Sequence, residues 1–246
     1  MNSYSINEFI NKTGPKARPR EVFGLQSERI LEVDLAGEVW AKIGAMAGYT
    51  GNIAFERERA LEHGMERAFK KTFTAEGQDL MKASGRGRLF LADHGKRITI
   101  LDLDGQRLTV KGEDLLAFEP SVEWNIEMMK KAAGVMSGGL FNITLHGQGK
   151  VVITTYFEPL TLPVYAGEPV FTDPAATVAW SGDVKPEFHT DINYRTFLGR
   201  GSGESIQMKF EGRGFVIIQP GAVSDTKHFS VSTFFTIVYV IISQFL

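Results

Sequence analysis

The sequence predicts a mainly β protein built from three similar antiparallel β-sandwich or barrel units in a pseudo-threefold arrangement, with short helical insertions. Short runs of β-branched and aromatic residues alternate with turn residues through most of the chain. A Gly-x-Gly pair followed by an apolar run occurs three times, and each tryptophan ends a similar segment ahead of one such pair. Self-similarity of this kind indicates repeated structural units.

The repeated features can be located residue by residue. The glycine pairs lie in MKASGRGRLFLADHG, ITLHGQGKVVITTYF and MKFEGRGFVIIQP, and they are Gly85/Gly87, Gly147/Gly149 and Gly212/Gly214. The tryptophans end LEVDLAGEVW, GEDLLAFEPSVEW and GEPVFTDPAATVAW, and they are Trp40, Trp124 and Trp180. We therefore expect a single β domain over residues 1–220, with repeats at about 30–103, 104–160 and 161–220. An atypical apolar tail follows at 221–246.

Local patterns add a turn and two helices to this scheme. The stretch RITILDLDGQRLTVKG predicts a hairpin whose turn is Asp104–Gly105 between two alternating strands. Residues 55–73 and 125–139 carry apolar side chains at helical spacing and predict the two insertions. The second stretch is rich in methionine, so its apolar face either caps the β core or binds partners.

The Gly-x-Gly pairs raise the question of a nucleotide site. A dinucleotide fingerprint needs a helix that opens on its last glycine, whereas a strand follows each pair here. We therefore interpret the glycines, with the tryptophans, as a structural motif that allows a bend or a close approach of two backbones.

Composition narrows the classes of function. The chain has 246 residues, 43% of them apolar and 23% charged, and a formal net charge of −2, so strong nucleic-acid binding is not expected. Cysteine is absent, which excludes thiol nucleophiles, disulfides and cysteine metal sites. The N-terminal residues lack the apolar core of a signal peptide, so we expect a cytoplasmic protein.

No catalytic, cofactor or metal site is predicted. His189 and Asp191 could offer two metal ligands from one strand face, but metal sites usually need three or four, and an exposed polar loop explains the pair as well. Neither a G-x-S-x-G elbow nor an H-E-x-x-H motif occurs. Enzymatic activity therefore has no positive support in the sequence.

The C-terminal tail is unusual because residues 229–246, FSVSTFFTIVYVIISQFL, contain no charge. Their length is near the lower limit for a membrane-spanning helix. Their many β-branched residues suit a strand equally well. A membrane anchor, a packed strand and a sequence end foreign to the fold all remain open, and membrane association would run through this segment.

The ordered repeats GEDLLAFEPSVEW, GEPVFTDPAATVAW and GESIQMKFEGRGFVIIQ resemble the family named for altered inheritance of mitochondria, number twenty-four. Its fold is grouped with the tryptophan RNA-binding attenuation protein, and the resemblance runs from about Glu32 to Pro220. It implies three similar β units and a non-catalytic role, with no catalytic residues to transfer. Because no mitochondrial presequence is evident, a bacterial member is expected. The third pair lacks the G-P-G form of many members, and the tail departs from their short polar ends.

Two functions follow as the main hypotheses, and an enzyme whose site is assembled across the repeats is kept as a third. The first is a non-enzymatic scaffold or interaction protein with unknown protein partners, which includes a membrane-peripheral position. The alternative is RNA or small-ligand binding by analogy of fold. Arg86 and Arg213 occupy the middle of two glycine pairs, but Gln148 interrupts the set. The oligomeric state is left open, because one chain with three units already closes a pseudo-trimer.

Overall fold

The computed structural model describes residues 3–57, 80–129, 141–190 and 206–220. The helical elements are α1 (Ile6–Thr13) and the short 3-10 helix η1 (Gly112–Asp114). The strands are β1 (Phe23–Ser27), β2 (Ile30–Lys42), β3 (Met46–Arg57), β4 (Leu80–Leu91), β5 (Arg97–Lys111), β6 (Leu115–Phe118), β7 (Val122–Met128), β8 (Phe141–Thr155), β9 (Leu160–Val164), β10 (Val170–Thr172), β11 (Thr177–Ser181), β12 (Val184–Thr190), β13 (Ile206–Gly212) and β14 (Gly214–Ile218).

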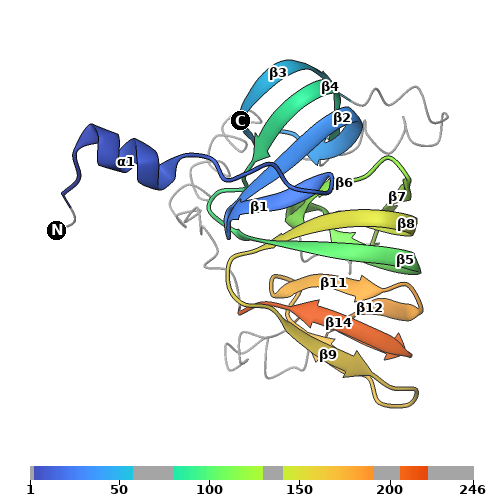
Figure 1. The fold of residues 1–246 in the computed structure, drawn as a ribbon. Helices are drawn as coiled ribbons and strands as arrows, with labels where there is room; N and C mark the ends of the chain where they lie inside the picture. Colours follow the sequence, from blue (N-terminus) through green and yellow to red (C-terminus); the bar gives the residue numbers. More distant parts are fainter. Residues whose placement is uncertain (1–2, 58–79, 130–140, 191–205, 221–246) are drawn as a thin grey trace, which may run out of the picture.

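Eleven of the strands form one sheet, with the order β3-β4-β2-β6-β8-β5-β11-β14-β9 and with β1 on β2 and β7 on β8. A smaller sheet has the order β10-β13-β12. Figure 1 shows the large sheet running from β3 and β4 at one end of the molecule to β9 at the other. The mainly antiparallel β class is thus confirmed. The described strands close no barrel, and a pseudo-threefold arrangement of units is not confirmed, because one sheet runs through all three predicted segments.

The first part of the sheet is held by a long ladder between β2 and β4, which pair without interruption from Leu31↔Leu91 to Lys42↔Leu80. Leu31, Val33 and Leu35 alternate along β2 and are buried. An alternating apolar strand places such side chains on one face of the sheet, where they form the core. Two further buried clusters follow along the chain, around β5–β8 and around Trp180 and Phe210.

The predicted hairpin at Asp104–Gly105 is wrong. Residues 97–111 form the single strand β5, which pairs with β8 on both sides of these residues. Asp104 lies opposite Gln148 and Arg107 opposite His146, so the ladder shifts register between them, and Gly105 has a positive φ of 80°. The Asp-Gly pair forms a bulge because β8 supplies partners to both halves of β5. The expected repeat boundary at 103/104 falls inside this strand.

The predicted helix over 125–139 is wrong where the structure describes it. Residues 122–128 form β7, in which Trp124 pairs with Leu145 and Ile126 with Ile143. Over so short a stretch, the spacing of the apolar residues fits a strand, where they lie two apart, as well as a helix, where they lie three or four apart. Pairing with β8 decides in favour of the strand. The start of the other predicted helix, residues 55–57, belongs to β3. The remaining residues of both predicted helices lie outside the described residues.

Candidate functional site

The first glycine pair lies within β4, where three strands come close together. Gly85 pairs with Gly37 of β2 and with Ile53 of β3, and its φ is 134°. A β-carbon on Gly85 would collide with the carbonyl oxygen of Asn52, and one on Gly87 with that of Thr50. Only glycine fits such a close approach of two backbones.

The other two pairs lie where a strand changes its partner. Before Gly147, β8 pairs with β7, and after Gly149 it pairs with β6. Gly212 ends β13 in the small sheet, and Gly214 begins β14 in the large one. All four of these glycines have positive φ, between 106° and 154°. A strand continues after each pair, so no helix N-terminus is available to bind a phosphate at these positions.

The tryptophans do not share one position relative to the glycines. Trp40 pairs with Lys82, and Trp124 with Leu145, both ahead of a glycine pair, whereas Trp180 pairs with Val216, beyond one. The rings of Trp40 and Trp124 meet edge to face, with centroids 5.6 Å apart, and Phe118 packs against both. Trp180 packs separately, against Phe210.

A buried charged cluster joins four segments that are distant in the sequence. Asp93, in the β4–β5 turn, accepts hydrogen bonds from Lys42 Nζ (3.0 Å) at the end of β2 and from Thr154 Oγ1 (2.9 Å) on β8. Lys96 Nζ donates to Asp114 Oδ1 (2.8 Å) and to the Glu113 carbonyl (3.0 Å) in η1. We call Lys42, Asp93, Lys96, Asp114 and Thr154 the charged cluster.

The pKa values of the two carboxylates in the charged cluster are shifted in opposite directions. Burial alone would raise the pKa of Asp93, but the hydrogen bond to His94 and the charge of Lys42 outweigh it and lower the pKa to about 2. Burial raises the pKa of Asp114 to about 6, even though Lys96 opposes this effect. Asp114 Oδ2 has no hydrogen-bond partner among the described residues. Its side chain is only 1% exposed, so the cluster links segments and presents no carboxylate to solvent.

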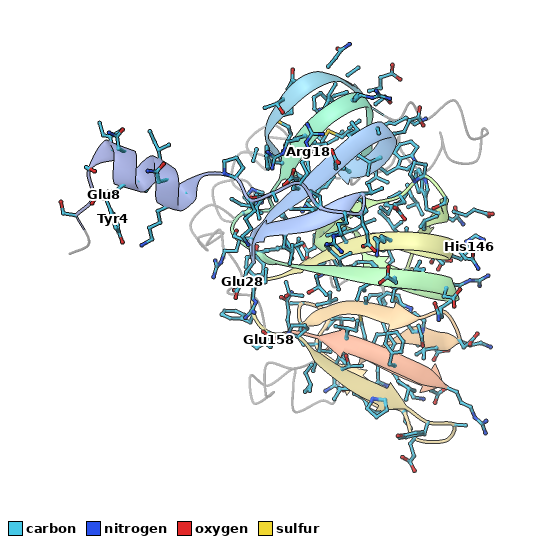
Figure 2. All side chains as sticks on the ribbon, in the orientation of Figure 1. Tyr4, Glu8, Arg18, Glu28, His146 and Glu158 are labelled. Carbon is cyan, nitrogen blue, oxygen red and sulfur yellow. The ribbon has the colours of Figure 1, made fainter. Side chains whose placement is uncertain are left out.

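The other polar candidates are dispersed. His189 stacks edge to face on Phe171, and Asp191 lies outside the described residues. His146 Nε2 lies 3.0 Å from Glu123 Oε2, and Figure 2 shows His146 and Glu158 toward opposite ends of the strands. Within residues 3–57, 80–129, 141–190 and 206–220, no three His, Asp or Glu side chains are placed to hold a metal ion. Of the middle residues of the glycine pairs, Gln148 donates to Asp104.

Among the described residues, the large apolar side chain with the highest exposure, Ile6, lies on α1, a helix that the sequence analysis did not identify. The helix begins with a capping box, in which Glu8 N donates to Ser5 Oγ (3.3 Å) and Ser5 N donates to Glu8 Oε2 (2.7 Å). None of its residues is buried, and Figure 1 shows it projecting from the β sheet. The signal in the sequence is S-x-x-E with apolar residues at 6, 9 and 10.

The chain that follows α1 is fastened to the sheet. Lys16 N donates to Gln26 Oε1 (2.7 Å) on β1, and the Lys16 carbonyl accepts from Arg88 Nη2 (3.0 Å) on β4. Arg18 forms a 3.0 Å ion pair with Asp34 on β2, and Figure 2 places its side chain against the sheet while Tyr4 and Glu8 lie far from it. These contacts attach the segment that follows the helix to the sheet.

The apolar tail at 229–246 lies outside the described residues. Among the helices that the structure describes, none combines the length and the apolar character needed to cross a bilayer.

Comparison with known proteins agrees with the fold. The family model described as mitochondrial biogenesis AIM24 matches residues 21–221. The crystal structure of a Streptococcus pyogenes protein is similar, with a TM-score of 0.63 and 23% sequence identity over 80% of this chain and 91% of that one. No curated protein matches the sequence significantly. A family model that spans most of the chain, over strands β1 to β14, shows that the chain belongs to the AIM24 family.

Proposed function

We propose that this member of the AIM24 family is a non-enzymatic interaction protein that acts as a scaffold. The observation that carries the proposal is an exposed apolar surface at the β9 edge of the large sheet. Among the described strands, β9 pairs with β14 alone, and four large apolar side chains of this region are 45–60% exposed: Tyr156, Phe157, Leu160 and Tyr165. We call these four residues the β9 surface.

The chemistry of the described interior supports the same proposal. The buried charges join β2, η1, β8 and the β4–β5 turn. The glycine pairs lie where two backbones come close together or where the chain changes its pairing partner. Large exposed apolar side chains along the edge strand of a sheet are typical of protein interaction sites. A scaffold needs such surfaces on a rigid frame, and a sheet of eleven hydrogen-bonded strands provides one.

Affinity capture with a matched pair of variants tests the proposal. The tagged full chain is compared with Leu160→Ser/Tyr165→Ser, which removes the two most exposed apolar side chains of the β9 surface, and with Thr161→Ser on the same strand as the control. We expect at least one partner that co-purifies with the full chain and the control and is lost with the double variant. Identical partner sets for all three proteins, or no partner for any, would contradict the proposal.

Membrane association through residues 229–246 is a separate part of the proposed function. Its support is the uncharged sequence of this segment. Flotation of the full-length protein beside a version that ends at Pro220 tests it. If only the full-length protein floats and resists an alkaline wash, the tail is an anchor. If the two versions float equally or both remain in solution, the tail has no such role.

A further inference from the structure

The α1 helix has one apolar and one polar face. Ile6, Phe9 and Ile10 lie at i, i+3 and i+4, which places them on the same side of the helix, and they are 79%, 55% and 58% exposed. Asn7 and Asn11 occupy another side. A helix whose apolar side is uncovered in water is stabilised when that side is buried, and two turns of helix alone are marginal in water.

The attachment of α1 keeps this apolar face away from the core of the described sheet. The helix ends at Thr13, Gly14 and Pro15 follow, and Lys16 is already bound to Gln26 and Arg88. Figure 1 shows the helix on the far side of this fastening point from β2 and β4. The occupant of the apolar face therefore comes from outside the described part of the chain.

The charge around α1 indicates what this occupant is. Residues 1–20 contain four cationic side chains and a single acidic one, although the whole chain carries a net charge of −2. Arg18 is paired with Asp34, while Lys16 and Arg20 are exposed in the segment that follows the helix. An apolar helix face with an aromatic residue and flanking cations is the pattern of helices that lie in the headgroup region of anionic membranes.

We propose that α1 binds the surface of a bilayer that contains anionic lipid. Ile6, Phe9 and Ile10 insert at the boundary between headgroups and acyl chains, and Lys16 and Arg20 lie over the lipid phosphates. A helix of this length extends about 12 Å along the surface, which gives reversible binding that needs the apolar and the electrostatic contribution together. The inference goes beyond the proposed scaffold role, because it assigns a lipid surface to a site separate from the β9 surface.

Vesicle sedimentation with the full-length protein tests the inference. One set of vesicles is pure phosphatidylcholine, and the other contains phosphatidylcholine and phosphatidylglycerol in equal parts. We expect binding to the anionic vesicles, and a loss of at least about tenfold in Ile6→Asn/Ile10→Asn and in Lys16→Gln/Arg20→Gln. The control Asn7→Ser/Asn11→Ser, on the polar side of the same helix, should stay within about twofold of the parent. Because α1 buries none of its residues and Lys16 and Arg20 are exposed, all variants should unfold at the same temperature as the parent.

A fluorescent probe on the helix gives a direct second measurement. In Phe9→Trp, insertion should shift the tryptophan emission to shorter wavelength with anionic vesicles and leave it unchanged with neutral ones. An emission that does not shift, or helix variants that sediment like the parent, would overturn the inference and assign any vesicle binding to another segment. The capture experiment on the β9 surface decides the scaffold proposal separately, so the two can fail independently.

Discussion

Replacing Asp114 by Asn removes the carboxylate of the charged cluster whose pKa is raised. Asp114 Oδ1 accepts a hydrogen bond from Lys96, while Oδ2 has no partner among the described residues. Asn keeps the size of the side chain and an oxygen for Lys96 but cannot ionise. The variant therefore isolates the contribution of the negative charge to stability.

The magnitude follows from the pKa of Asp114. Burial raises it from the ordinary value of 3.8 to about 6. Between these two pH values Asp114 holds a proton in the folded protein that it has lost in the unfolded chain, so the free energy of unfolding falls as pH rises. The full effect is about 3 kcal/mol, present below the unfolded pKa and lost once pH exceeds the folded pKa. About 2 kcal/mol of it falls between about pH 4.5 and about pH 7.5.

Urea unfolding of the parent and Asp114→Asn at these two pH values measures the effect. We expect the free energy of unfolding of the variant, relative to the parent, to increase by about 2 kcal/mol from the lower to the higher pH. Any pH-independent cost of the new amide cancels in this comparison. Asp102→Asn, which removes a carboxylate whose side chain is 75% exposed, is the control and should change by less than about 0.5 kcal/mol. If the relative stability of Asp114→Asn is the same at both pH values, the inferred burial cost of this charge is wrong.

Three further sets of substitutions test the packing and pairing of the sheet. Gly85→Ala should lower the free energy of unfolding by about 3 kcal/mol or more, because φ is 134° and the carbonyl oxygen of Asn52 blocks a β-carbon. Gly105 also has a positive φ but has open space around it, so Gly105→Ala should lower the free energy of unfolding by only about 1–2 kcal/mol in the same urea titration. Equal losses for both would show that the close approach is unimportant. Arg88→Met leaves the buried carboxylate of Glu32 without its ion-pair partner at 2.5 Å and should lower the free energy of unfolding by about 3–5 kcal/mol. The double variant Arg88→Met/Glu32→Gln should recover part of this loss. Calorimetry of both variants checks this, and a double variant no more stable than Arg88→Met would argue against it. A double-mutant cycle on Trp40→Leu and Trp124→Leu should give a coupling of about 0.5–1.5 kcal/mol, whereas Trp40→Leu and Trp180→Leu should be additive. Coupling of similar size in both cycles would contradict the separate packing of Trp180.

Local sequence signals were enough to predict the antiparallel β class, because turn residues and alternating apolar runs act over a few neighbouring positions. They failed where a distant partner decides the outcome. Asp104–Gly105 is a strong turn signal, yet β8 continues along both halves of β5 and converts the turn into a bulge. Trp124 and Ile126 fit a strand, whereas Ile126 and Met129 fit a helix, and the ladder of residues 122–128 with β8 selects the strand.

The charged cluster could not be predicted for a related reason. Lys42, Asp93, Asp114 and Thr154 are spread over more than a hundred residues, and no short motif connects them. Only the order of strands in the sheet brings them within hydrogen-bond distance. The α1 helix, in contrast, has a local signal in its capping box at Ser5 and Glu8. A search for signal peptides alone overlooks this pattern, because the apolar residues are interrupted by polar ones.

The position of β5 in the middle of the large sheet has a consequence during synthesis on the ribosome. One edge of β5 pairs with β8, but the other pairs with β11, which begins at Thr177, well after β5 ends at Lys111. At translation rates of about 5–20 residues per second, about 3 to 13 s separate the two strands. During that interval the edge of β5 that will receive β11 stays open on the nascent chain. Slow codons or a strand-binding chaperone acting between residues 111 and 177 would therefore affect the yield of folded protein more than the same delay placed before β2.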